Sequence, residues 1–548
     1  MLQQPEIKHK LVFLTVNSSF SHSSLALPLL HNACADLVQW EWYRYDMTNA
    51  EDVMSAVRKI SSCTPDLLLT DLYLFNRVTA LDVLQRYHAL APQCRIVAGG
   101  PECLGDGADA LLASYPWLDC VIRGEGEESL RDYLLHFDDV PRTLPCILPP
   151  DGNGVYKNWA TSPYPVTDSF FVTDKPFVQM ETSRGCPMGC LYCTSGRTTT
   201  RYRSLEQVRE ELRLLALKGV TELRLLDRTF NMPRSRGAAL LRLFREEFPM
   251  LRFHLEVHPQ YLNDELREEL QNALPGQLHI ECGIQCLDPE VQMLMGRRSD
   301  SVEALSGLRF LCSQRAFETH ADLLAGLPGQ KMEHIISDTG ALMETGVAEI
   351  QLEVLKVLPG TPMRVTGPER GLCWSPDAPY DVMCSDTMTL EDIALTRDLS
   401  RLLDLTWNHS ELHSAAVVMR WECVDFVSRL LSYFHESGGT ATVLWDLKKR
   451  FIFLQSFCEK YQLEKSQRVL AYQWLCAGFP PEQGPDRYSS KTSTVPDGAE
   501  LIHGDGCCLG ERETRYWRFA DAEIIYYFAY NRKYSFNRPS AIWAEKEN

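Results

Sequence analysis

Short apolar runs alternate with helix-like segments in the N-terminal part of the chain. The runs are Leu11–Val16, Asp66–Thr70, Arg95–Ala98 and Cys120–Ile122, each bounded by small or turn-forming residues. Continuous apolar runs of this length are typical of parallel strands that are buried on both faces. Between the second and third run, Val78–Leu90 has apolar residues at helical spacing. We therefore predict a doubly wound, Rossmann-like α/β domain over residues 1–136.

Residues 137–168 are rich in proline and are predicted to be a linker, because Pro and Gly interrupt regular structure. A second alternation of strands and helices follows over residues 169–368. One of its helices begins at Ser204 with a capping box completed by Gln207. The predicted strands are Phe177–Thr182, Val220–Leu226, Phe253–Val257, Leu278–Cys282, Thr319–Leu324 and Glu349–Val354. They are fewer than the eight strands of a closed barrel, so we predict a partial (βα)6 barrel of the TIM type.

The pattern changes to longer helices in residues 369–548. The candidate helices are Ser414–Phe434 and Thr442–Tyr461, and the aromatic segment Arg515–Phe536 is expected to form a strand pair. We expect a mostly helical C-terminal domain, for which the sequence indicates no role.

The charge balance is acidic, since 73 Asp and Glu against 55 Lys and Arg give a formal net charge of −18. A broad nucleic-acid surface needs clustered Lys and Arg, so we expect no nucleic-acid partner. The first apolar run is too short for a signal peptide. No apolar stretch reaches the roughly 18 residues of a membrane-spanning helix. The sequence therefore predicts a cytoplasmic protein without a membrane partner.

Three of the 19 cysteines have a spacing that indicates chemistry. Residues 183–196 read SRGCPMGCLYCTSG and contain Cys186, Cys190 and Cys193. Three thiolates this close can bind three irons of one 4Fe–4S cluster, and the glycines between them let the loop wrap it. No fourth cysteine is nearby, so one iron keeps a position for an external ligand. A zinc site and a structural cluster with a distant fourth thiolate remain alternatives.

The segment CPMGCLYC resembles the signature loop of the radical S-adenosylmethionine (SAM) superfamily, with an aromatic residue, Tyr192, before the last cysteine. An α/β domain followed by this loop is similar to the cobalamin-binding class of that superfamily, the class B methyltransferases. The resemblance covers residues 10–365. It implies a 4Fe–4S cluster that cleaves SAM reductively, and cobalamin as a further cofactor.

The resemblance also implies residues that bind SAM at the carboxyl ends of barrel strands, where catalytic groups are expected on physical grounds as well. Arg298 is suited to pairing with the SAM carboxylate through its planar guanidinium. Each of these residues has a structural role as its alternative. The candidate SAM ligands are Tyr192, Asp227, Glu256, Glu281, Gln285, Arg298 and Gly326.

Small residues and glycines follow the predicted N-terminal strands, in NSSFSHSS (17–24), TDLYLFN (70–76), GGPE (99–102) and RGEGE (123–127). Ligands of doubly wound sheets bind at these strand ends, and the resemblance implies that the ligand is cobalamin. Many cobalamin domains supply a cobalt-binding histidine from a D-x-H-x-x-G loop, but here His22 lacks that aspartate and glycine. The candidate cobalamin residues are Ser18, Ser19, His22, Asp71, Gly99, Gly100, Gly124 and Glu125.

The expected function is radical SAM methyl transfer from cobalamin to a carbon of a small molecule or peptide. An electron donor such as flavodoxin or ferredoxin is the expected partner, and no catalytic residue is assigned. A radical rearrangement or cyclisation, with or without cobalamin, is one alternative, and a non-catalytic iron–sulfur electron carrier or sensor is another. A tRNA methylthiotransferase is disfavoured, because the chain has neither further N-terminal cluster thiols nor a basic RNA-binding module.

Overall fold

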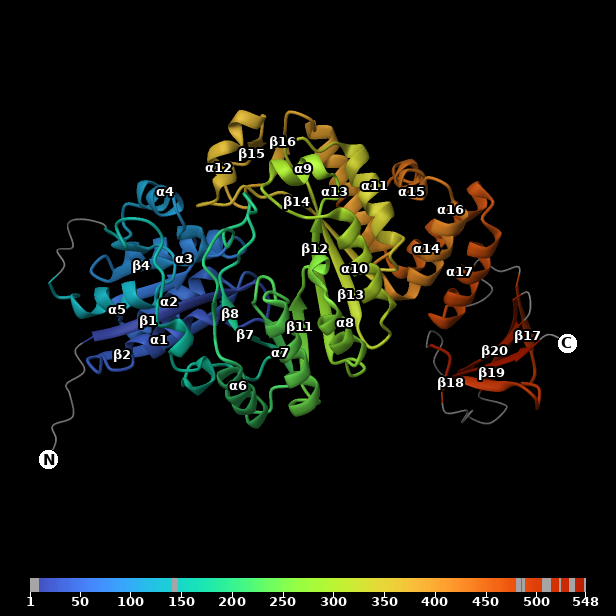
Figure 1. Ribbon diagram of the computed structural model, residues 1–548, viewed down its shortest axis with the longest axis horizontal. Coiled ribbons are helices and arrows are strands. Elements are labelled where there is room, and N and C mark those ends of the chain that lie inside the picture. The colour runs from blue at the N-terminus through green and yellow to red at the C-terminus, as the bar shows by residue number, and fades with distance from the viewer. Residues whose placement is uncertain are drawn as a thin grey trace. The chain divides into compact units, whose positions relative to one another are not determined.

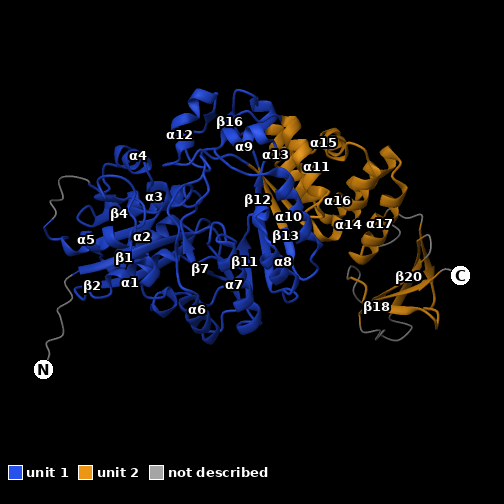
Figure 2. Ribbon diagram, in the orientation of Figure 1, with its two compact units in different colours: residues 1–319, 324–331, 354–393 blue, residues 320–323, 332–353, 394–548 orange. Residues whose placement is uncertain are grey.

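The computed structural model describes residues 9–139, 146–479, 484, 488–504, 514–521, 524–531 and 538–546. The chain divides into two compact units (Figure 2). Unit 1 comprises residues 1–319, 324–331 and 354–393, and unit 2 comprises residues 320–323, 332–353 and 394–548.

The N-terminal part of unit 1, which is blue in Figure 1, contains a six-stranded sheet. Its strand order is β2-β1-β3-β4-β5-β6. Every neighbouring pair of its strands is parallel. The strands are β1 (His9–Asn17), β2 (Trp40–Thr48), β3 (Leu67–Asp71), β4 (Arg95–Gly99), β5 (Cys120–Ile122) and β6 (Cys146–Leu148). The predicted doubly wound α/β fold is therefore confirmed.

Alternate residues of β1 enter two separate hydrophobic cores, one on each face of this sheet. Val12 and Leu14 pack with helices α2 (Val53–Cys63), α3 (Arg77–Leu90) and α4 (Gly107–Ser114). Leu11 and Phe13 pack with α1 (Ala26–Cys34) and α5 (Glu127–Leu135) on the opposite face. Burial on both faces explains the continuous apolar runs of the sequence.

Two strands of this sheet were not predicted from the sequence. Strand β2 reads WEWYRYDMT and lies at the sheet edge, where polar residues interrupt the apolar run. Strand β6 lies inside residues 137–168, so this segment is more than a linker. Its three residues pair in register with β5, for example Cys146 with Cys120.

The second six-stranded sheet has the order β14-β13-β12-β11-β10-β7. Strands β7 and β10 to β14 follow one another without exchange, as expected for an open barrel, and the six predicted strands are confirmed. The strands are β7 (Val178–Met180), β10 (Glu222–Leu225), β11 (Arg252–Glu256), β12 (Leu278–Gln285), β13 (Glu318–Ala325) and β14 (Glu349–Val354). The pairs β7–β10, β10–β11 and β11–β12 are parallel.

Unit 1 also contains helices and short strands. Helix α6 (Leu205–Leu217) begins with the predicted capping box, in which Ser204 and Gln207 bind each other's backbone N–H groups. The others are α7 (Arg234–Glu247), α8 (Asp264–Gln271), α9 (Pro289–Leu294), α10 (Ser301–Ser313), α12 (Pro362–Thr366), β8 (Ser183–Arg184), β9 (Arg201–Tyr202), β15 (Cys373–Trp374) and β16 (Val382–Cys384).

Unit 2 contains helices and a five-stranded antiparallel sheet with the order β17-β19-β20-β21-β18. The predicted helix Ser414–Phe434 is two helices, because the chain turns at Asp425, where φ is +54°. The elements are α11 (Met332–Met343), α13 (Leu390–Leu405), α14 (Ser410–Glu422), α15 (Phe426–Glu436), α16 (Leu447–Tyr461), α17 (Glu464–Cys476), β17 (Ser489–Thr492), β18 (Glu500–Gly504), β19 (Thr514–Asp521), β20 (Ile524–Asn531) and β21 (Ala541–Lys546).

Strands β19 and β20 are the strand pair predicted in Arg515–Phe536. Within the described parts of the chain, no helix is both long and apolar enough to cross a membrane.

Candidate functional site

The three cysteines of the signature segment lie on one loop, which strands β8 and β9 close at its base. Arg184 of β8 pairs with Arg201 of β9 in antiparallel register. Within the loop, the N–H of Thr198 donates to the carbonyl of Cys186 over 3.1 Å. The N–H of Cys186 donates to Thr198 Oγ1 over 2.9 Å. These bonds join the two halves of the loop next to its first cysteine.

The three cysteine side chains are shielded from water to different extents. Cys186 and Cys190 are buried and Cys193 is half-buried. The Sγ of Cys186 is 3.6 Å from Thr229 Oγ1, and the N–H of Ser195 donates to the Sγ of Cys193 over 3.4 Å. Burial raises the pKa of the Cys193 thiol. Three soft sulfur donors on one short loop fit an iron–sulfur cluster with three protein ligands.

Gly189 leaves no room for a side chain in this loop. A Cβ atom at Gly189 would lie 2.6 Å from the carbonyl oxygen of Gly296, and one at Gly185, where φ is +96°, would lie 2.6 Å from that of Thr199. Both contacts are with backbone, which cannot move aside as a flexible side chain can. The loop is therefore built around its glycines.

We expect Gly189→Ala to lower the free energy of unfolding by about 2 kcal/mol, because the added methyl group forces backbone apart. The variant should also take up less iron. Urea unfolding and iron analysis after anaerobic reconstitution measure both effects. Gly340→Ala is the control, since a Cβ there meets nothing within 4 Å. Equal stability and iron content of Gly189→Ala and the wild type would contradict this prediction.

An arginine that the sequence analysis did not select lies beside the cysteines. Arg297 donates to the hydroxyl of Tyr192 over 3.4 Å and to the carbonyl of Gly283. One of its nitrogens is 3.2 Å from Nε2 of His258. Burial, followed by the charge of Arg297, lowers the pKa of His258 to about 3. The predicted ligand Arg298 is exposed, so the structure places Arg297 rather than Arg298 against Tyr192.

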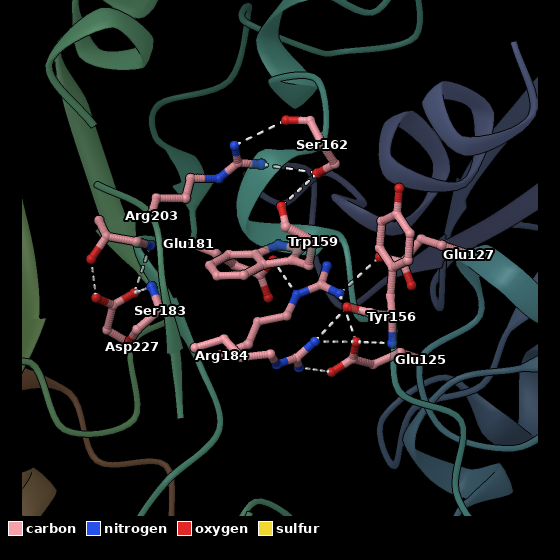
Figure 3. A network of polar contacts seen from close by, with 12 residues as sticks. Glu125, Glu127, Tyr156, Trp159, Ser162, Glu181, Ser183, Arg184, Arg203 and Asp227 are labelled. Carbon is pink, nitrogen blue, oxygen red and sulfur yellow. Dashed lines mark hydrogen bonds and ion pairs between the residues drawn. The ribbon is translucent and has the colours of Figure 1, made fainter. Parts of the chain in front are cut away.

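Asp227 is buried and its carboxylate is occupied by the chain itself. Oδ1 accepts hydrogen bonds from the N–H groups of Thr182, over 2.7 Å, and Ser183, over 2.9 Å. Oδ2 accepts a bond from the hydroxyl of Thr182. Asp227 therefore joins the end of β10 to the segment that leads into the cysteine loop (Figure 3). Its contact with SAM stays a prediction.

The remaining predicted SAM residues lie on barrel strands or directly after them: Glu256 ends β11, while Glu281 lies within β12. Glu256 and Glu281 are direct neighbours across β11 and β12, and burial raises the pKa of Glu256. Glu256 lies 3.7 Å from the guanidinium of Arg228. Gln285 ends β12 with a φ of +70°, and Gly326 follows β13 with a φ of +84°. Their contacts with SAM also stay predictions.

A cavity of about 350 Å³ lies within unit 1, beside the cysteine loop. One wall is formed by the ends of β3, β4 and β5 and by helix α1, and the other includes residues of β7, β8 and the cysteine loop. This volume is within the range of small-molecule sites. Five of the predicted cobalamin residues line the cavity: Asp71, Gly99, Gly100, Gly124 and Glu125.

Ser18, Ser19 and His22 are not among the residues that line this cavity. The Nδ1 atom of His22 is within hydrogen-bond distance of both serine hydroxyls, at 3.2 and 2.9 Å. The imidazole packs edge-on against the ring of Phe177, with 5.1 Å between centroids. His22 thus contacts the segment before β7, which agrees with its lack of the D-x-H-x-x-G pattern.

The cavity has features that suit a large flat ligand carrying amide groups. Gly100 has a φ of +96°, and a Cβ there would lie 2.7 Å from the carbonyl oxygen of Leu72, so the floor is bare backbone. Asp71 is buried, and its Oδ1 has no hydrogen-bond partner among the described residues. Its Oδ2 accepts a bond from Ser24 over 2.9 Å. A glycine floor and a free carboxylate oxygen fit the corrin ring of cobalamin and its peripheral amides.

The buried carboxyl group of Asp71 should make the free energy of unfolding depend on pH. Burial raises its pKa to about 6, above the ordinary value, so the folded protein holds this proton more tightly than the unfolded chain does. The free energy of unfolding should therefore fall between about pH 4 and pH 6 and stay lower above that range. Asp71→Asn removes this loss, which amounts to about 3 kcal/mol. Urea unfolding of the cofactor-free protein at pH 4.5 and 7.5 tests it, and an equal pH dependence of variant and wild type would refute it.

Known proteins resemble both the central part of the chain and its fold. Residues 180–338 match the radical SAM superfamily, and residues 369–481 match a protein of unknown function (DUF4080). The cobalamin-dependent radical SAM methyltransferase TokK of Streptomyces tokunonensis is 24% identical over 394 residues. The match covers 65% of this chain and 58% of TokK, so the chain spans less than two thirds of that relative.

Two solved structures share the fold. The radical SAM methyltransferase TsrM of Kitasatospora setae, with tryptophan and a SAM analogue bound, has a TM-score of 0.54 at 19% identity, over 68% of this chain and 79% of that one. The cobalamin-dependent SAM radical enzyme OxsB, with aqua-cobalamin and SAM bound, has a TM-score of 0.57 at 13% identity, over 85% and 78%. Residues 180–338 of this chain therefore match the radical SAM superfamily, and the chain shares the fold of the TsrM and OxsB structures.

Proposed function

We propose that this protein is a cobalamin-dependent radical SAM methyltransferase that acts on a carbon of a small molecule or peptide. The cavity beside the cysteine loop carries the proposal. Gly99 and Gly100 line it from the first sheet, while Arg184, Gly185 and Ser195 line it from the loop and its base. A cofactor in this cavity would lie next to the cysteines. A reaction that needs both cofactors at one substrate requires such proximity.

The residues of the chain would bind and orient the cofactors and exclude water from them. Cys186, Cys190 and Cys193 would hold the 4Fe–4S cluster, and the glycine floor with Asp71 would hold cobalamin. When bound, the cluster would supply the electron that cleaves SAM, and cobalamin would carry the methyl group. The proposed surroundings of SAM are Tyr192 of the cysteine loop, Arg298 after α9, and the barrel residues Asp227, Glu256, Glu281, Gln285 and Gly326.

Two partners follow from this chemistry. SAM would be consumed both as the source of the radical and as the methyl donor. An electron donor such as flavodoxin or ferredoxin would reduce the cluster.

The test is anaerobic production of the full chain with cobalamin supplied. Iron, sulfide and cobalt are quantified, SAM and dithionite are added, and both nucleoside products are measured by mass spectrometry. The proposal expects about four irons, stoichiometric cobalt, 5′-deoxyadenosine and S-adenosylhomocysteine. Cys193→Ala is the matched control for both products.

The alternatives have their own outcomes. 5′-Deoxyadenosine without S-adenosylhomocysteine would exclude methyl transfer and favour a radical rearrangement or cyclisation. A cluster whose spectrum is indifferent to SAM would favour an electron carrier or sensor. Absence of iron from the reconstituted protein would refute the proposal as a whole.

A further inference from the structure

Three arginines flank the cysteine loop and lie around one buried tryptophan. Figure 3 labels two of them, Arg184 and Arg203, beside Trp159. Arg184 precedes the loop, and Arg201 and Arg203 follow it. Their guanidinium carbons lie 5.1, 6.0 and 5.2 Å from the ring centroid of Trp159. Trp159 is fully buried and begins a short 3₁₀ helix in the segment between the first sheet and the barrel. Its ring faces all three cations, a geometry that favours them electrostatically.

Two of these arginines form an unfavourable pair on their own. Arg184 and Arg201 are direct cross-strand neighbours in β8 and β9, the pair that closes the base of the cysteine loop. Like charges directly opposite each other destabilise a strand pair. Both side chains are largely shielded from water, with relative exposures of 11% and 19%. Arg184 is compensated by Glu127, over 2.8 Å, and by Glu181, over 2.9 Å. A carboxylate that binds Arg184 and Arg201 together would in addition hold the two strands at the base of the loop next to each other.

Glu125 is a carboxylate that both arginines share. Its Oε2 accepts hydrogen bonds from Arg184 Nη1, over 3.3 Å, and Arg201 Nη1, over 3.1 Å, while its Oε1 accepts a bond from Arg201 Nη2. The N–H of Tyr156 donates to Oε2 over 2.7 Å. One carboxylate thus joins both ends of the cysteine loop to the segment that carries Trp159.

Glu125 also belongs to the wall of the cavity. It lies in the RGEGE loop after β5 and lines the proposed cobalamin site. Its backbone N–H donates to the carbonyl of Gly154 over 3.0 Å, which fixes the loop itself. Both carboxylate oxygens are already bound by the protein. The carboxylate of Glu125 thus holds the base of the cysteine loop, and the same residue lines the cavity.

We propose that Glu125 is a positioning residue, which sets the distance and orientation of the cysteine loop relative to the corrin pocket through Arg184 and Arg201. This inference rests on the proposed function. A purely structural ion pair would change stability only, whereas a positioning residue changes the separation of two bound cofactors. That separation decides whether the radical and the methyl group reach the same substrate carbon.

The test compares the spin relaxation of cobalt in the wild type and in Glu125→Gln. Both proteins are loaded with the cluster and with saturating cobalamin. They are then reduced until the cluster and the cobalt are both paramagnetic. The reduced cluster accelerates the spin relaxation of cobalt steeply with decreasing distance. We expect a severalfold slower cobalt relaxation in Glu125→Gln, at unchanged iron and cobalt content. Glu128→Gln is the matched control, because the same substitution then falls on an exposed carboxylate three residues away.

Arg201→Lys is the second variant, since it keeps the charge but cannot make the paired bonds to Glu125. It should also slow the spin relaxation of cobalt, as Glu125→Gln does. Unchanged cobalt relaxation in both variants would overturn this inference but not the proposed function. Failure of Glu125→Gln to hold cobalamin at saturation would also overturn it, because Glu125 would then be a binding residue. A wild type that takes up iron but no cobalt would overturn the inference together with the cobalamin-dependent function.

Discussion

Cys186→Ala is expected to reduce bound iron from about four atoms per chain to nearly none. It should also reduce 5′-deoxyadenosine formation to the uncatalysed background. With one of three thiolates gone, the loop would offer two ligands, and the proposed Fe–S cube would be poorly held. Cys186 is buried beside Thr229. Bulk water therefore has little access to the iron that would lose its sulfur ligand. The measurements are iron and sulfide content, the visible spectrum and the nucleoside product after reduction.

The control for this experiment is Cys94→Ala. Cys94 is also a buried cysteine, but it lies in the hydrophobic core of the N-terminal sheet. Its replacement removes a small apolar group and should leave iron content and 5′-deoxyadenosine formation near those of the wild type. If Cys186→Ala retained a full cluster, the assignment of the loop as its binding site would be wrong.

Asp227→Ala is expected to lower the free energy of unfolding by about 4 kcal/mol, because it leaves two buried backbone N–H groups and the hydroxyl of Thr182 without their acceptors. These donors lie in the segment that leads into the cysteine loop. We therefore expect less iron per folded chain as well as lower stability. Urea unfolding measures the first effect, and iron analysis of the soluble protein measures the second.

Asp227→Asn separates this structural role from a contact with SAM. The amide keeps one acceptor oxygen, so it should restore most of the stability and iron content. SAM affinity, measured by its effect on the spectrum of the reduced cluster, then reports any direct contact. Full stability of Asp227→Ala would contradict the role that the hydrogen bonds indicate.

Strands with a regular pattern of buried residues could be predicted from the sequence. Four strands of the first sheet have continuous apolar runs, because parallel strands covered on both faces need them. Barrel strands β10, β11, β12 and β14 instead alternate buried residues with less buried ones. Edge strand β2 escaped prediction because polar residues occupy its less covered side. Strand β6 escaped because it has only three residues among prolines. The break of the predicted helix at Asp425 depends on a left-handed backbone conformation that helical periodicity does not reveal.

Residues of the candidate site could be selected from the sequence only where they lie close together along the chain. The cysteine motif and the glycine-rich strand ends are continuous in the sequence, and five of the eight proposed cobalamin residues line the cavity. Choosing between Arg297 and Arg298 requires knowledge of which side chain turns inward after α9. The contacts of Glu125 join residues up to 76 positions apart. No local pattern contains such pairs, although the arginines on both sides of the cysteine loop were a visible signal.

Strand β6 has a consequence for how this protein can be divided or recombined. A fragment ending at residue 136 would remove β6 and leave β5 as an unprotected edge, open to pairing with other chains. It would also remove Gly154, which bridges to Gly124 beside the cavity. The modular unit for domain exchange or separate expression therefore extends past residue 154. A graft designed on the apparent linker would aggregate rather than transfer the ligand site.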